Sequence, residues 1–304
     1  MNKRLFIIFL LGFSSGLPLS LISSTLQAWF ADSGMSVLAT GALSLVGLPY
    51  AWRFLWGPVL DRYSLGALGK RRSWILVMQV LLLAGFNLMA WLNPVDYPKT
   101  MACLALVLAC CSATQDLAID AQRTEYLPQN EHALGASMAV FGYRLALLLS
   151  GGLALIMAQH MGWAWTYRLM GLTMITGMIA IYSSQEPSLQ NQEQLSFAQA
   201  YLAPVKEMFS RNGIIPLLLF IFFYKLGEAF TTTTSGIVMP FLIQGLGFSL
   251  ETIGYVNKIL GMAAVLSGGL VAGIILLRHS IYRSMLYFGL LQALTNVFFV
   301  VLAM

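Results

Sequence analysis

The sequence predicts an all-α integral membrane protein with about nine transmembrane helices. Two measures of composition support this class. Hydrophobic residues make up 58% of the 304-residue chain and charged residues only 10%, whereas soluble domains carry about a quarter charged residues. The mean hydropathy is +0.76. The third observation is that apolar runs of about twenty residues, the length that crosses a bilayer, recur from end to end.

The apolar runs give the expected helices in chain order. Their ranges are 5–28, 37–60, 74–92, 100–121, 133–158, 163–183, 214–243, 251–276 and 285–304. The first run is too long for a signal peptide, and no small-x-small cleavage site precedes the second. We therefore interpret it as a retained first helix.

Basic residues outside these helices fall mostly on one side of the membrane. With a cytoplasmic N-terminus, the cytoplasmic segments hold Lys3, Arg4, Arg62, Lys70, Arg71, Arg72, Arg123, Lys206, Arg211, Arg278 and Arg283. Only Lys99 and Arg168 then lie outside. The positive-inside rule predicts this orientation. The net charge of +5 is thus explained by topology and does not indicate nucleic-acid binding.

One polar segment divides the chain into three parts. Residues 1–183 hold six of the expected helices, 184–213 form a cytoplasmic linker, and 214–304 hold three. Apolar residues recur in the linker at steps of three and four, at Leu195, Ala198, Leu202, Val205 and Phe209. This pattern favours an amphipathic helix at the membrane surface over a solvated linker.

A repeat with an offset of 213 residues relates the first and last parts. Gly34-Met35-Ser36, followed by Gly41, recurs as Gly247-Phe248-Ser249, followed by Gly254. Repeated six-helix halves are typical of transporters, which handle substrate near the bilayer midplane between the halves. The second half holds three helices, so we expect it to be truncated, with three further helices missing. A non-transporting remnant or membrane sensor is the alternative.

Metal and disulfide chemistry are not indicated. The three cysteines share one span, and the three histidines lie singly in predicted loops. They are Cys103, Cys110, Cys111, His132, His160 and His279. We expect no cofactor.

The ionisable residues inside predicted helices include Arg53, Asp116, Asp120, Arg144, Lys225, Glu228 and Lys258. A charge at the bilayer centre costs roughly 3 kcal/mol, so these residues should face a cavity or pair. Asp116 and Asp120 are four residues apart and share one helix face. Two such carboxylates resist ionising together, which suits proton coupling. The alternative for Asp120 is an ion pair near the cytoplasmic end, with Arg62 or Arg123. An intramembrane aspartyl protease needs its aspartates on separate helices, which argues against an enzyme.

The other membrane charges have expected partners. Arg144 could pair with Asp116 from the neighbouring helix, and Lys225 with Glu228 as a structural or proton-linked pair. Lys258 offers a positive charge to an anionic substrate, whereas Arg53 is expected to snorkel toward the cytoplasm.

Polar and small residues in the first helix suggest two roles. Gly12 and Gly16 suit close helix packing, or a broken helix beside a site in the case of Gly16. Gln27 and the nearby hydroxyls suit hydrogen bonds to a sugar.

The loop between the second and third helices resembles a signature of the major facilitator superfamily. It reads Gly57-Pro-Val-Leu-Asp61-Arg62 and, after extra residues beyond Tyr63, Gly69-Lys70-Arg71-Arg72. The resemblance implies a gating loop, formed by Gly57, Asp61, Arg62, Gly69, Arg71 and Arg72, that restrains opening at the cytoplasmic side.

Further strings resemble the AmpG-type muropeptide permeases of that superfamily. They are GFSSGLPL (12–19), TLQAW (25–29), FLWGPVLDRY (54–63), SATQDLAIDA (112–121), GYRLALLLSGGLAL (142–155), YKLGEAF (224–230), FLIQGLGF (241–248) and VNKILG (256–261). Glu228 stands where an aspartate is common. The resemblance implies proton-driven import of N-acetylglucosaminyl-1,6-anhydro-N-acetylmuramyl peptides across a Gram-negative inner membrane. This import serves peptidoglycan recycling and can influence β-lactamase induction.

On this interpretation, the small-molecule substrate and the membrane lipids are the expected partners. Asp116, Glu228 and Asp120 would carry protons. Substrate-binding candidates are Gln27, Gln115, Arg144, Lys225, Asn257 and Lys258. The alternative is a transporter of another substrate on the same fold, such as an acyl-coenzyme A or a sugar conjugate.

Overall fold

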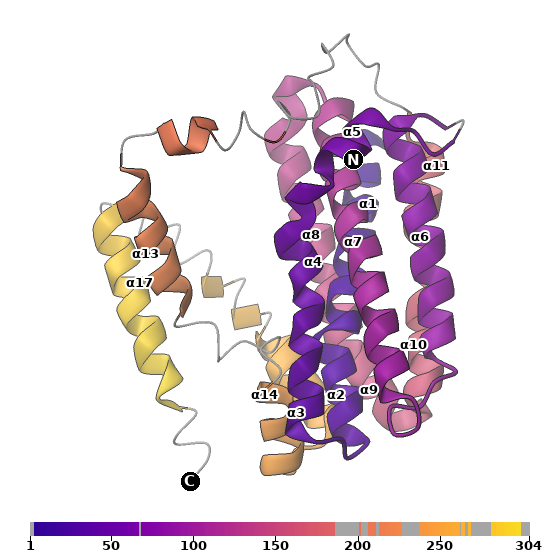
Figure 1. Cartoon of the computed structure of the whole chain (residues 1–304), viewed down its shortest axis with the longest axis vertical. Helices are drawn as coiled ribbons and strands as arrows, with labels where there is room; N and C mark the ends of the chain where they lie inside the picture. The colour runs from indigo at the N-terminus through magenta and orange to yellow at the C-terminus, as the bar shows by residue number, and fades with distance from the viewer. Residues whose placement is uncertain are drawn as a thin grey trace.

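The computed structural model describes residues 3–66, 68–185, 201, 206–210, 213–226, 237–261, 263–264, 267–268 and 281–298. Within these ranges every regular element is a helix and no strand occurs (Figure 1). The predicted all-α class is therefore confirmed for the described residues.

The first half begins with one long helix that is interrupted once. Its two parts are α1 (Lys3–Ile22) and α2 (Ser24–Asp32). They meet at Ser23, whose φ of −111° and ψ of −101° lie outside the helical region. Non-helical backbone at membrane depth is tolerated where it is buried in protein or lines a cavity, and Ser23 is buried.

The second crossing is not the single helix expected over 37–60 but a series of short helical turns. These are α3 (Val37–Ala42), η1 (Leu43–Gly47), α4 (Leu48–Trp52), η2 (Arg53–Leu55) and α5 (Gly57–Arg62). Pro49 and Pro58 stand in the first turns of α4 and α5. Because proline has no backbone N–H, it cannot donate the hydrogen bond to the residue four positions earlier, and it therefore favours the first turn of a helix.

The remaining helical segments of the first half are mostly longer. They are α6 (Lys70–Met89), α7 (Pro98–Tyr126), η3 (Gln129–Glu131), α8 (His132–Leu147), η4 (Leu148–Leu153), α9 (Ala154–Met161), α10 (Trp163–Leu172) and α11 (Ile175–Ser183). By length and composition, the described segments Lys3–Asp32, Lys70–Met89, Pro98–Tyr126 and Leu134–Met161 could each cross a membrane. The fourth helix was predicted to end at residue 121, which was wrong. In the structure α7 continues through polar residues to Tyr126.

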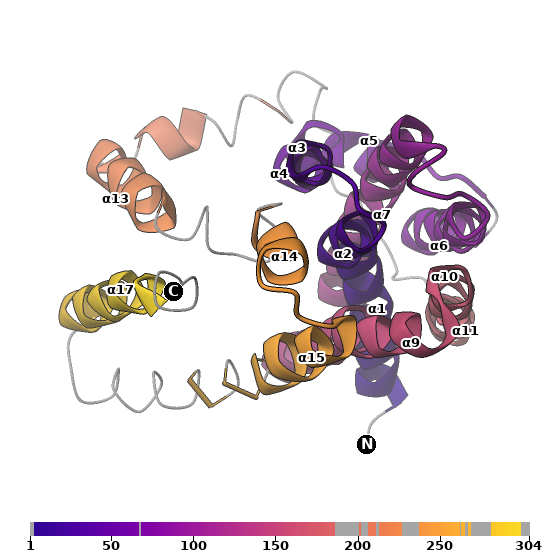
Figure 2. The same ribbon diagram turned by 90° about the horizontal axis from the view of Figure 1, so that it is seen from below.

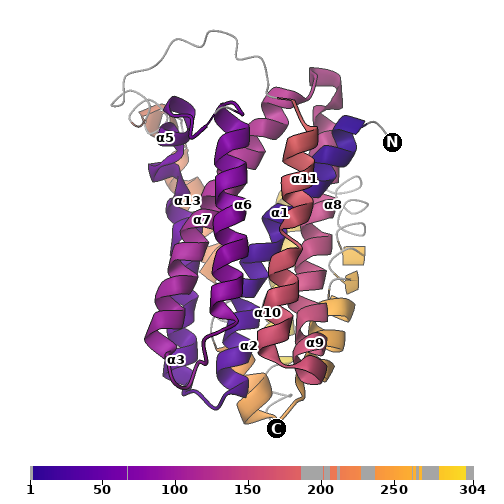
Figure 3. The same cartoon turned by 90° about the vertical axis from the view of Figure 1, so that its right-hand side faces the viewer.

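α1 lies inside the first half and packs against α7, α8 and α11 (Figure 3). Glycines permit its close approach to α8. A Cβ added at Gly12 would lie 2.3 Å from the carbonyl oxygen of Ala139, and one at Gly142 would lie 2.2 Å from that of Phe9. The packing role predicted for Gly12 is therefore confirmed.

The described elements of the second half are α13 (Ile214–Leu226), α14 (Val238–Pro240), η5 (Phe241–Gly245), α15 (Leu250–Ile253), η6 (Gly254–Leu260) and α17 (Ile281–Asn296). Residues 238–260 pack against α2, α9 and η4 of the first half. In contrast, α13 and α17 lie side by side and apart from the bundle in both views (Figures 1 and 2). Most of the amphipathic helix predicted within 184–213 lies outside the described residues.

The repeated glycine–serine turns have the same geometry. Gly34 and Gly247 have positive φ values of 75° and 68°, which glycine adopts readily. Ser36 and Ser249, at ψ values of 151° and 152°, begin the helices that follow. Each serine side chain accepts a 3.2 Å hydrogen bond from the backbone N–H three residues later. Both turns lie at the end of the molecule opposite the N-terminus (Figure 1).

Candidate functional site

Asp116 lies where α7 contacts α1, and its carboxylate accepts a hydrogen bond from Ser15. The Ser15 Oγ to Asp116 Oδ1 distance is 2.6 Å. Ser15 is buried, whereas Asp116 is only partly buried, so part of Asp116 remains accessible from outside the protein. An ionised carboxylate is costly to bury without such a donor.

Other polar groups surround this carboxylate within electrostatic range. They are the hydroxyls of Tyr50 on α4 and Tyr143 on α8, and the guanidinium of Arg53 on η2. Arg53 forms no salt bridge with Asp116 among the described residues, and its snorkelling toward the cytoplasm stays a prediction. The Ser15 hydroxyl can donate to the ionised Asp116 carboxylate or accept from its protonated form.

The predicted ion pair between Arg144 and Asp116 was wrong for the structure described here. No salt bridge joins them among the described residues. The reason is the position of α1, which packs extensively against α8 and also against α7. Sequential helices are therefore not the closest neighbours of each other at this depth.

Two glutamines make a fully buried polar contact beside the Asp116 site. Gln115 Nε2 donates to the carbonyl oxygen of Ser14 at 3.0 Å, and Gln79 Nε2 donates to Ser14 Oγ at 3.1 Å. Gly177 leaves room for them, since a Cβ there would lie 2.2 Å from Gln79 Nε2. The structure places Gln115 in helix packing, and its role in substrate binding stays a prediction.

A second polar region joins the break in the first helix to η4. Thr25 Oγ1 donates to the Ser150 carbonyl at 2.8 Å, and the Ser20 hydroxyl lies 3.2 Å from that of Ser24. Ser150 belongs to a π-helical segment, a form that often marks functional sites in helices. The predicted candidate Gln27 is fully buried in the same stretch.

The two halves meet at η4 and η6, which are both π-helical. A Cβ added at Gly254 on η6 would lie 3.0 Å from the carbonyl oxygen of Gly152 on η4, so the backbones are in close contact. Asn257 and Lys258 belong to η6, but their side chains lie outside the described residues, as does Glu228. Lys225 is exposed at the end of α13.

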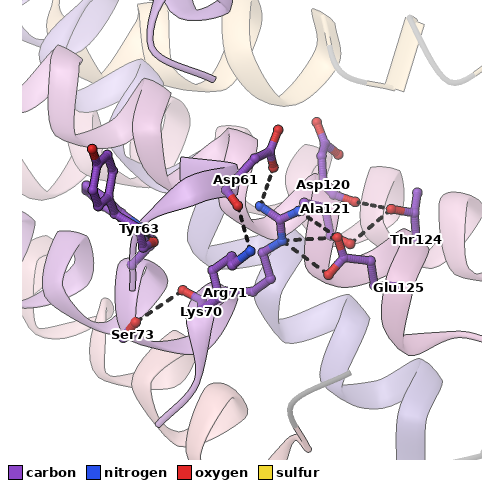
Figure 4. Close-up of polar contacts among 10 residues, drawn as sticks. Asp61, Tyr63, Lys70, Arg71, Ser73, Asp120, Ala121, Thr124 and Glu125 are labelled. Atoms are coloured by element: carbon purple, nitrogen blue, oxygen red, sulfur yellow. Dashed lines mark hydrogen bonds and ion pairs between the residues drawn. The ribbon is translucent and has the colours of Figure 1, made fainter. Parts of the chain in front are cut away.

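At the end that carries the N-terminus, Arg71 joins three helices (Figure 4). Its NH1 lies 2.7 Å from Asp61 Oδ1 on α5, and its NH2 lies 2.6 Å from Glu125 Oε1 on α7. Arg71 is only 8% exposed. Lys70 Nζ also donates to the Asp61 carbonyl oxygen, at 2.6 Å. Glu125 was not predicted from the sequence. The available signal was its position just beyond the predicted fourth helix, on the same side of the membrane as the gating loop.

The remaining loop residues have simpler positions. Gly69 has a φ of 100°, which a side chain would strain, and Gly57 begins α5. Arg62 is exposed, whereas Arg72 Nε donates to the Ile181 carbonyl oxygen at the end of α11, at 3.2 Å.

Asp120 is exposed and pairs with Arg123 on the same helix at 3.3 Å, as the structural alternative predicted. Its role in proton coupling stays a prediction. Within the described part of the chain, no cluster of three or more histidine, cysteine or acidic residues could hold a metal ion.

The described part of the chain is thus a bundle of helices, four segments of which are long and apolar enough to cross a membrane, with interrupted helices and a repeated turn. The Major Facilitator Superfamily sequence profile matches residues 6–304. The chain therefore belongs to the major facilitator superfamily.

Known proteins extend this result. The chain is 43% identical over 296 residues to the anhydromuropeptide permease of Escherichia coli K12, covering 97% of this chain and 60% of that protein. It is 30% identical over 309 residues to putative transporter AmpG 4 of Rickettsia felis, covering 98% and 74%. The chain thus spans 60% of the length of the E. coli relative.

A solved structure supports the fold alone. It is a bacterial homolog of the human lysosomal transporter Spinster, in an inward-facing, unoccupied conformation. The TM-score is 0.60 at 13% identity, and the alignment covers 92% of this chain and 64% of that one.

Proposed function

We propose that this chain imports anhydro-muropeptides across a bacterial inner membrane by proton symport, in the service of peptidoglycan recycling. The observation that carries the proposal is the 43% identity to the E. coli anhydromuropeptide permease over 97% of this chain. The N-terminus lies in the cytoplasm, as the distribution of basic residues favours. Residues 1–183 and 214–304 act as the two moving parts, with 184–213 as their linker.

Asp116 carries the coupled proton. Protonation removes its charge while the Ser15 hydroxyl remains beside it, so the neutral form can cross between states without an exposed intramembrane ion. Release of the proton leaves a carboxylate near Arg53. Glu228 and Asp120 assist this transfer.

The substrate binds where η4 meets η6, between the halves. Its sugar hydroxyls and amides are of the class that Gln27, Gln115 and Asn257 can hydrogen-bond. Its peptide carboxylates pair with Lys225, Lys258 or Arg144. The Arg71 contacts hold the cytoplasmic ends of α5, α6 and α7 together during the cycle.

The test is uptake of a labelled anhydro-muropeptide into energised vesicles that contain this chain, with and without a protonophore. Vesicles with the E. coli permease serve as the positive control, and vesicles with neither protein as the blank. Accumulation that the protonophore abolishes supports the proposal. No uptake by this chain, under conditions where the control accumulates substrate, refutes it. Competition by free anhydro-disaccharide, but not by an acyl-coenzyme A, distinguishes the proposed substrate from the alternative.

A further inference from the structure

Gln244 connects the two halves at the end of the molecule opposite the N-terminus. Its side-chain Nε2 donates to the carbonyl oxygen of Ala31 at 2.9 Å and to that of Met35 at 2.8 Å. Ala31 and Met35 flank the turn at Gly34, at the end of α2. Gln244 itself lies on η5, in the second half.

The chemistry of a helix end explains why an amide fits there. Ala31 is in the last turn of α2, where carbonyl groups form the negative end of the helix dipole, and its oxygen also accepts a hydrogen bond from the Gly34 N–H at 3.1 Å. Met35 lies three residues beyond the helix. The amide nitrogen of glutamine has two N–H donors, and each of the two carbonyl oxygens lies within reach of one. The second half thus donates one hydrogen bond to the end of α2 and one to the turn that follows it.

Gln244 itself is exposed, and the residues close to it in the chain make a largely apolar contact with the first half. Val238, Met239 and Leu242 are buried against the core that includes α2. Close backbone packing of Gly254 against Gly152 continues the contact toward the middle of the molecule. Figure 2 shows α14 beside α2 and α15 beside α9. By contrast, the Arg71 contacts at the other end lie entirely within the first half.

The equivalent residue of the first half cannot form the same contact in return. Gln244 and Ala31 are equivalent positions at the offset of 213 residues. The methyl group of Ala31 cannot return a hydrogen bond, so the Gln244 amide alone supplies this pair of bonds between the two turns.

We propose that Gln244 is a latch that keeps this end of the molecule closed, and that substrate entry requires its two hydrogen bonds to break. The proposal rests on the proposed function in one respect, which is that this end is the periplasmic entrance. The latch is a positioning device and does not itself bind substrate.

A buried reporter cysteine tests the latch without relying on transport. Met239 is fully buried in α14. Met239→Cys is placed in a background whose three native cysteines are replaced by alanine. A membrane-impermeant maleimide, added to right-side-out vesicles, then labels the introduced thiol at position 239 only when this end opens.

Three variants are compared on the reporter background. Gln244→Met keeps the side-chain length and removes both hydrogen bonds. Gln244→Glu removes the donors and places a negative charge against the carbonyl end of α2. Gln129→Glu adds the same charge at an exposed position of η3, at the other end of the molecule, and is the matched control. Met101→Cys, a buried position within α7 of the first half, is the control reporter.

We expect Gln244→Met to speed labelling of the thiol at position 239 about tenfold or more, from the loss of two neutral hydrogen bonds. Gln244→Glu should speed it further, because like charges repel at the helix end. Gln129→Glu should leave the rate unchanged, and the control thiol at position 101 should stay unreactive in every variant.

Two results would overturn the latch. One is an unchanged labelling rate in Gln244→Glu. The other is an equal rise in labelling of the control thiol at position 101, which would indicate general loosening of the protein. No muropeptide uptake by the parent chain, together with labelling as expected in the variants, would refute the proposed function and leave the latch standing.

Discussion

Replacing Arg71 tests the contact that holds the ends of three helices together. Arg71→Gln removes a guanidinium that is 8% exposed and leaves two carboxylates without their cation. The Asp61 side chain is 65% exposed, so water can solvate it and its loss of a partner costs little. The Glu125 side chain is only 28% exposed and loses bonds to Nε and NH2, so it dominates the cost.

The magnitude follows from these exposures. Removing one partner of a fully buried ion pair costs about 3–5 kcal/mol, and partial solvation of Glu125 reduces this to about 2–3 kcal/mol. For a chain of this size, each kcal/mol shifts the melting temperature by about 2 °C or more. We expect Arg71→Gln to lower the Tm by roughly 4–6 °C. Arg71→Lys keeps the positive charge but loses the planar guanidinium with its several N–H donors. Its Tm should therefore lie between those of the parent and of Arg71→Gln.

The assay is thermal unfolding of the purified protein in detergent, with Arg62→Gln as the control. Arg62 is exposed in the same loop, so its loss should change the Tm by less than about 1 °C. The double variant Arg71→Gln/Glu125→Gln should be less destabilised than the sum of the two single variants, because the orphaned carboxylate is gone. If Arg71→Gln unfolds within a degree of Arg62→Gln, the argument from burial and charge fails.

Three further predictions concern positions inside the bundle. Asp116→Asn should abolish protonophore-sensitive accumulation in the vesicle assay, and retained accumulation would exclude Asp116 as the proton carrier. Gly142→Ala should cost about 1–3 kcal/mol from overpacking at the α1–α8 contact, whereas Gly47→Ala, where a Cβ meets nothing within 4 Å, should not destabilise; equal Tm values would contradict this packing. Trp163→Phe should cost about 1.5–3 kcal/mol by removing the 2.7 Å hydrogen bond to Asp32 Oδ2, and a Tm equal to that of the parent would contradict it.

Features that depend on local sequence could be predicted well. Each apolar run is about as long as a helix that crosses a bilayer. The runs therefore predicted the all-α class and most helix positions of the first half. The repeat also located the two glycine–serine turns, but the positive φ at Gly34 and Gly247 and the serine caps that follow were not predicted, although a few local residues set them. Interruptions by proline and π-helical segments within the crossings were not anticipated.

The composition of the candidate site could be predicted only in part. Asp116 was found because a carboxylate in an apolar run is unusual. Ser15 and Tyr143 were missed because they come near Asp116 only after α1 has packed against both α7 and α8. Tyr50 was missed because it comes from α4, which packs against α7. The same arrangement explains why the expected partner Arg144 is not at this carboxylate. Long-range helix order, which a single sequence does not contain, decided both outcomes.

The two ends of the molecule are held by contacts of different strength, and this difference bears on which of them changes during transport. The Arg71 network is charged, partly buried and confined to one half, so loss of Arg71 costs about 2–3 kcal/mol. The Gln244 contact consists of two neutral hydrogen bonds between the halves at an exposed side chain, which together are worth about 1–1.5 kcal/mol net. A cycle that moves the halves relative to each other therefore breaks the Gln244 contact at low cost and leaves the Arg71 network intact. On this reasoning Gln244 variants should speed opening and lower the Tm by less than Arg71→Gln does, whereas Arg71 variants should leave the rate of opening unchanged.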